Sequence, residues 1–139
     1  MKTSFRYVAV LLTLGLAAFA GCSNDTDAKQ PTPTELEHEL SDLGVPAGAT
    51  ADQMSKPTAK CASLTQTYRY PGTAGELATH YRTVATANGW SPVGSVGDAE
   101  TINGSSFLKD LNGTSLYLSV KKATETYDVV LRGVDAKDC

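Results

Sequence analysis

Several segments of the chain alternate apolar and polar residues with the period of two that is typical of a half-buried β-strand. In the first of them, Leu64 and Tyr68 fall on one face and Arg69 falls on the other. Pro92 weakens the second segment, which we therefore expect at an edge of the sheet. The alternation predicts five strands, at residues 62–70, 90–96, 105–111, 114–122 and 125–134.

The principal helix is predicted between the first and second of these strands. Thr73 and Glu76 have the spacing of a capping box, in which two side chains satisfy free N–H groups at a helix N-terminus. Leu77 and Tyr81 belong to an apolar stripe at helical spacing, and Asn88-Gly89 supplies a left-handed stop. The large aromatic residues that we expect in the core, rather than on a ligand platform, are Tyr68, Tyr81 and Trp90.

A shorter helix is predicted ahead of the first strand. Thr34 and Glu37 have the spacing of a second capping box, and three leucines recur at helical spacing before Gly44 ends the run. The largely polar residues 45–60 predict a loop. The ordered domain is therefore expected to begin near Cys61.

These elements have the order β-α-β-β-β, which predicts an α+β fold with one main helix packed on a single, mostly antiparallel sheet. Asn103-Gly104 and Asn112-Gly113 suit the positive φ angles of tight hairpin turns, so the last three strands form a meander. A right-handed crossover makes the first two strands parallel. With the five strands numbered along the chain, we expect the spatial order 2-3-4-5-1.

Residues 1–21 have the three parts of a secretory signal peptide. Lys2 and Arg6 form a positive n-region. The uncharged residues 7–20 that follow are shorter than the ~20 apolar residues that span a bilayer. The segment therefore predicts export and removal of the signal rather than a membrane span.

The sequence Phe19-Ala20-Gly21-Cys22 resembles the lipobox of bacterial lipoproteins, with Phe19 where that family most often has leucine. The resemblance implies cleavage before Cys22 and a diacylglyceryl lipid on its thiol, which anchors the chain to the outer face of the cytoplasmic membrane. Ser23 is not the aspartate that retains enterobacteria-like lipoproteins in the inner membrane, so in a two-membrane cell the resemblance points to the outer membrane. The alternative is an ordinary signal peptide cut at Ala18 or Ala20.

Removal of the signal leaves 118 of the 139 residues, enough for one domain and a tether. Loss of Lys2 and Arg6 changes the formal net charge from −3 to −5 without a basic cluster, so nucleic acid is not an expected partner. Residues 22–34 predict the lipidated cysteine and a flexible polar spacer. A short helix and loop at 35–60 and a small α+β domain at 61–139 follow.

Cys61 and Cys139 remain after lipidation of Cys22, and an exported chain with an even number of cysteines predicts one disulfide. The bridge would close nearly the whole domain, which the chain-entropy model values at about 4 to 5 kcal/mol at most. The alternative is a redox-active thiol pair, but the local Cys-x-x-Cys spacing of such sites is missing.

A second resemblance covers about half of the mature chain. Pro71-Gly72-Thr73, Leu77, Tyr81 and Gly89-Trp90 resemble small bacterial envelope lipoproteins in which a Pro-Gly turn, a helix with a central tyrosine and a Gly-Trp exit precede a β-meander. The resemblance implies a fold and brings no activity with it.

Catalytic motifs are missing from the sequence: it has no serine-nucleophile signature, phosphate-binding loop or zinc motif. Glu76 and His80 lie four residues apart and could supply two metal ligands, which are too few without partners. Glu37, His38 and Glu39 lie on the other helix, which we expect to be mobile. We therefore expect no metal, no cofactor and no catalytic activity.

The sheet face opposite the helix is the remaining candidate surface. Tyrosine and arginine are over-represented at binding hot spots, although a half-wet antiparallel sheet normally carries such residues. The expected function is an interaction or accessory module that binds a protein or another component of the cell envelope. A small-ligand binder with a cleft between helix and sheet, and an enzyme, are the alternatives. The candidate binding residues are Arg69, Tyr117, Lys121 and Arg132.

Overall fold

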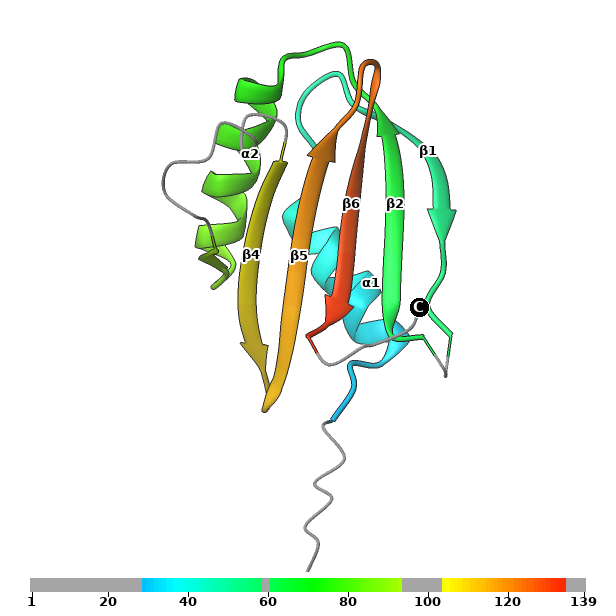
Figure 1. The fold of residues 1–139 in the computed structure, drawn as a ribbon, viewed down its shortest axis with the longest axis vertical. Helices are drawn as coiled ribbons and strands as arrows, with labels where there is room; N and C mark the ends of the chain where they lie inside the picture. The colour runs from blue at the N-terminus through cyan, green and yellow to red at the C-terminus, as the bar shows by residue number, and fades with distance from the viewer. Residues whose placement is uncertain (1–28, 59–60, 94–103, 135–139) are drawn as a thin grey trace, which may run out of the picture.

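The computed structural model describes residues 29–58, 61–93 and 104–134. Within these ranges, six strands form one antiparallel sheet and two helices lie on one side of it (Figure 1). The chain therefore has an α+β fold, as its sequence predicts. The helices are α1 (Pro33–Leu43) and α2 (Ala74–Ala87), and the strands are β1 (Thr50–Ser55), β2 (Ser63–Arg69), β3 (Ser91–Pro92), β4 (Gly104–Leu111), β5 (Thr114–Lys122) and β6 (Thr126–Gly133).

The strands lie in the order β1-β2-β6-β5-β4-β3, and each neighbouring pair is antiparallel. The five strands predicted from the sequence take the spatial order expected for them, with β2 beside β6 and the short β3 at an edge. Because an even number of antiparallel pairings separates β2 from β3, these two strands run in the same direction, as the crossover through α2 requires.

The prediction of a loop over residues 45–60 is wrong for Thr50–Ser55, which form β1 and pair with β2. Every residue of β1 is exposed, so the strand is held at the sheet edge by backbone pairing and buries no side chain. Its pairing register with β2 also shifts between Ala51 and Met54. A strand of this kind carries no apolar alternation, and its sequence therefore gives no signal.

The N-terminus of α1 also differs from the prediction. Thr32 is the N-cap: its Oγ1 accepts the N–H of Glu35 at 3.2 Å, and the Glu35 carboxylate accepts the Thr32 N–H at 2.7 Å. The box predicted at Thr34 and Glu37 is wrong because Pro33 occupies the first helical position. Proline has a preset φ there and holds the preceding residue in extended backbone.

The other predicted helix and turn signals are found largely where expected. Thr73 and Glu76 form the capping box of α2, with the Thr73 N–H donating to the Glu76 carboxylate at 2.8 Å. Gly89, just after α2, has a φ of +82°, and Asn112-Gly113 turns the β4–β5 hairpin with φ angles of 53° and 81°. Of Asn103-Gly104, only the glycine lies in the described residues, where it begins β4.

The core lies between the helices and the inner face of the sheet. Leu118 of β5 and Leu131 of β6 are fully buried there, and α1 contributes three leucines. α1 and β1 are therefore integral to the fold, although the sequence predicts that the ordered domain begins near Cys61. The α1 leucines are Leu36, Leu40 and Leu43.

Candidate functional site

The candidate site is the open face, the side of the sheet that points away from α1 and α2 (Figure 1). Residues that pair across neighbouring strands share a face, so the strand registers define its members. All four residues that the sequence predicts for binding lie on this face. Its members are Ser63, Thr65, Thr67, Arg69, Ser106, Leu108, Asp110, Ser115, Tyr117, Ser119, Lys121, Thr126, Asp128, Val130 and Arg132.

One row of the open face carries an arginine stacked on a tyrosine. Arg132 and Tyr117 are register partners, and the Arg132 guanidinium carbon lies 5.0 Å from the centre of the Tyr117 ring. The Tyr117 hydroxyl donates to Ser106 Oγ at 2.8 Å, which fixes the ring from the other side. Arg132 is exposed and forms no ion pair with a described residue. Its planar N–H groups are therefore oriented and available to an acceptor.

The next charged row contains Thr67, Asp128 and Lys121. Thr67 Oγ1 donates to Asp128 Oδ1 at 2.6 Å, so that carboxylate is held toward β2. Lys121 is the register partner of Asp128 on the other side, but no ion pair joins the two. Lys121 is exposed and has no hydrogen-bond or ion-pair partner in the described ranges. It is the second cation of this face that is free to bind.

Arg69 lies at the β1 side of the open face. Its Nε donates to Asp52 Oδ2 at 3.3 Å, and 73% of the arginine side chain is exposed. A pair this exposed contributes roughly 0 to 1 kcal/mol to stability. Because Asp52 already engages its guanidinium, Arg69 is a weaker candidate for binding than Arg132.

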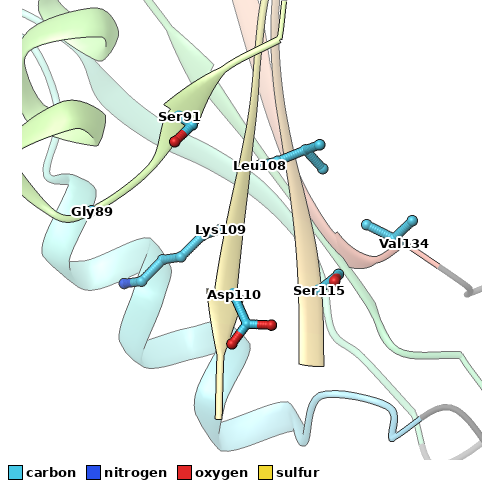
Figure 2. Close-up of a pocket in the computed structure, with 7 residues that line it drawn as sticks. All are labelled: Gly89, Ser91, Leu108, Lys109, Asp110, Ser115 and Val134. Atoms are coloured by element: carbon cyan, nitrogen blue, oxygen red, sulfur yellow. The ribbon is translucent and has the colours of Figure 1, made fainter. Parts of the chain in front are cut away.

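An open hollow of about 330 Å³ lies where β3, β4 and β5 meet the end of β6. Figure 2 shows Leu108 and Lys109 pointing to opposite sides of β4, so the hollow wraps around an edge rather than entering the core. Leu108 is 37% exposed and Val134 is 44% exposed. The lining residues are Gly89, Ser91, Leu108, Lys109, Asp110, Ser115 and Val134.

Lys109 belongs to a buried ion pair that the sequence does not reveal. Its Nζ lies 2.8 Å from both carboxylate oxygens of Glu39 and 5.7 Å from the centre of the Trp90 ring. Glu39 is only 4% exposed, because α1 packs its buried side against the sheet. Its position between Leu36 and Leu43 at helical spacing is the signal that places it on the buried stripe of α1.

The predicted core aromatics are confirmed as core. Tyr81 and Tyr127 are fully buried with their hydroxyls 3.1 Å apart, and Tyr68 stacks on Tyr127 at 5.0 Å. Burial raises the pKa of Tyr127 to about 12 and raises the pKa of Tyr81 further, so both stay neutral. The alternative prediction places a ligand-binding cleft between helix and sheet. These side chains occupy that space.

The predicted exposed polar face of α2 holds for Glu76 but not for His80. The Glu76 carboxylate is engaged by Thr73, which lowers its pKa through hydrogen bonds from the backbone and side chain. His80 is half-buried edge-on to Tyr81, and its Nε2 has no hydrogen-bond partner. No group of three or more His, Cys, Asp or Glu side chains in the described ranges is placed to hold a metal ion.

Most of the residues that the lipidation and disulfide predictions concern lie outside the described ranges. Cys22 and Cys139 lie outside the described residues. Cys61 precedes β2. Its backbone is tied to Thr58, whose Oγ1 accepts the Cys61 N–H at 3.1 Å. Neither α1 nor α2, the helices of the described ranges, has the length and apolarity needed to cross a membrane.

Comparison of the chain with protein-family models, with curated proteins and with solved structures found no match. Among the described residues, Lys121 and Arg132 are exposed cations without an ion-pair partner, on a sheet face that neither α1 nor α2 covers.

Proposed function

We propose that this chain is a lipid-anchored protein of the bacterial cell envelope that binds a protein partner through its open face and has no catalytic activity. The observation that carries the proposal is a pair of exposed cations, Lys121 and Arg132, on a sheet face that no described helix covers. Neither cation has an ion-pair partner among the described residues. A surface cation without a partner in its own chain can bind a carboxylate without first breaking an existing pair.

The surroundings of these cations favour a protein as the ligand. Tyr117 is fixed between Arg132 and Ser106, so little side-chain entropy is lost when a partner packs against it. Serine and threonine side chains around it supply further hydrogen-bond donors and acceptors. A fixed aromatic ring beside an arginine is the typical composition of a binding hot spot, and the two cations favour an acidic partner surface.

The anchor is the second part of the proposal. The lipobox resemblance at residues 19–22 supports removal of residues 1–21 and lipidation of Cys22. The mature domain then lies at the outer face of the cytoplasmic membrane or, in a two-membrane cell, on the outer membrane. A disulfide between Cys61 and Cys139 would stabilise this domain in the envelope, because it restricts the conformations of the unfolded chain.

Site-specific photocrosslinking tests the open face. A photoreactive amino acid in place of Ser119, which lies between the rows of Tyr117 and Lys121, is expected to capture an envelope protein in living cells. The matched control places the same group at Glu37, an exposed residue of α1 on the other side of the molecule. Equal capture from both positions, or capture from position 37 alone, contradicts the proposal.

The anchor and the disulfide have their own measurements. Cys22→Ala is expected to abolish fatty-acid labelling, and continued labelling of that variant refutes the lipobox. Cys61 and Cys139 are expected to resist alkylation until a reductant is added. Alkylation of both thiols in the untreated, exported protein rules out their pairing.

A further inference from the structure

The described chain begins at one end of the sheet, which we call the tether end. A Cβ on Gly133, the last residue of β6, would lie 2.7 Å from Gln30 Oε1 and 2.9 Å from Pro31 Cδ. Pro31 is itself buried. The segment that leads into α1 therefore packs against the end of β6, at the lower end of the sheet in Figure 1.

The proposed lipid anchor restricts where this end can be, and the inference therefore rests on that proposal. Eight residue steps separate Cys22 from Gln30. At the maximum of ~3.6 Å per residue they span at most about 30 Å, whatever their conformation. The tether end is thus always close to the lipid surface, whereas the opposite end of the strands can stand away from it.

Two aliphatic side chains are exposed together at the tether end. Leu108 and Val134 line the same hollow and keep 37% and 44% of their surface exposed (Figure 2). The Val134 N–H donates to the Ser115 carbonyl at 2.8 Å, so this part of the chain is held in place as a continuation of the sheet. Exposed aliphatic groups on a rigid frame are suited to an apolar surface.

The charge distribution favours this side of the molecule for contact with a membrane. α1 carries four acidic residues and no lysine or arginine, and it lies on the opposite side of the sheet. An anionic lipid surface repels such a helix, whereas the open face carries both signs of charge. Leu108 lies on the open face, so it is separated from α1 by the sheet.

We infer that Leu108 and Val134 dock the tether end onto the lipid surface that holds the anchor. Two partly exposed aliphatic side chains bind a membrane too weakly to act alone, but the short tether supplies a high local concentration. The docking would orient the domain, with the strands rising from the membrane. Tyr117 and Arg132, in the same cross-strand row as Leu108, then lie near the membrane end of the open face, and Lys121 and Arg69 lie farther from it. The docking would therefore give the lipid-anchored domain a defined orientation relative to the membrane.

Tryptophan fluorescence in lipid vesicles tests the orientation. The lipidated variants Val134→Trp and Met54→Trp are matched, because the two side chains are 44% and 45% exposed and Met54 lies on the edge strand β1. In vesicles that contain brominated phosphatidylcholine, position 134 is expected to lose at least twofold more emission than position 54. The native Trp90 is buried in both variants and supplies the same background.

Flotation of the same vesicles separates the two claims. Protein that floats but shows equal quenching at both positions overturns the docking and leaves the anchor intact. Protein that does not float overturns both. A photocrosslinker in place of Leu108 provides a second measurement in cells, where a phospholipid adduct is expected. An adduct to another protein, or to a second copy of this chain, assigns the corner to that partner and overturns the inference.

Discussion

The two faces of β5 and β6 are built from the same strands but have opposite compositions. Leu116, Leu118 and Val120 point inward and are buried, whereas the alternating residues Tyr117, Ser119 and Lys121 point outward. The covered face is filled with aliphatic groups that pack against the helices. The open face carries ordered polar groups, and neither α1 nor α2 covers them. The alternation separates two tasks, because a residue of one face can change without altering the packing of the other.

The largest expected effect breaks the covered face. Leu118→Ala removes a fully buried side chain, and we expect it to lower the free energy of unfolding by about 2 to 5 kcal/mol. Ser119→Ala, the next residue on the open face, is expected to change it by less than about 0.5 kcal/mol. Urea denaturation of both variants measures the difference. Equal losses in the free energy of unfolding would mean that the open face contributes to stability as much as the covered face does.

A smaller effect is expected from the Glu39–Lys109 ion pair, which lies on the covered side of the sheet. Glu39→Gln leaves the Lys109 ammonium without its carboxylate, and we expect a loss of up to about 3 kcal/mol. The value is at the low end for a buried pair because 17% of the Lys109 side chain is exposed. Glu37→Gln on the exposed side of α1 is the control. A double variant, Glu39→Leu with Lys109→Met, should recover much of the loss, and no recovery would contradict this account.

The stability of the fold should also depend on pH, through His80 of α2. Burial lowers the pKa of His80 in the folded protein below the ordinary value of 6.5. The unfolded chain therefore binds this proton first, so stability is full above pH 6.5 and decreases as the pH falls below it. His80→Gln is expected to lose this part of the pH dependence. Melting curves from pH 7.5 to 5 that are parallel for the two proteins would exclude the effect.

The smallest effect on stability is expected on the open face. Arg132→Ala removes an exposed cation–π contact, worth about 0.5 to 1 kcal/mol at most. The same change should strongly reduce crosslinking from position 119, because charge-assisted hydrogen bonds to a partner contribute about 1.5 to 3 kcal/mol. Arg82→Ala, on the exposed side of α2, is the control. A stability loss with unchanged crosslinking would assign Arg132 to the fold alone.

Much of the fold follows from the sequence because its elements have strong local causes. Thr73 and Glu76 cap α2, and Asn112-Gly113 turns a hairpin through backbone angles that glycine tolerates. β1 is missed because TADQMS buries no side chain. The start of α1 is misplaced because Pro33, rather than the spacing of Thr and Glu, decides which threonine caps the helix.

The candidate site is predictable only in part. Period-two alternation is sufficient to assign Arg69, Tyr117, Lys121 and Arg132 to one face. It does not reveal which cations are paired, because that depends on contacts between distant segments such as Glu39 and Lys109. The hollow is hidden for the same reason, since Gly89 and Val134 are brought together only by the complete sheet.

The most direct test of the open face as a binding surface is lysine footprinting in the native envelope. An amine-reactive reagent is applied to intact envelopes and to the purified protein, and labelling of Lys121 is compared with labelling of Lys56, an exposed residue just after β1. We predict that Lys121 is protected severalfold in the envelope, whereas Lys56 reacts equally in both samples. Equal labelling of Lys121 in the two samples would contradict the claim that a partner covers this face.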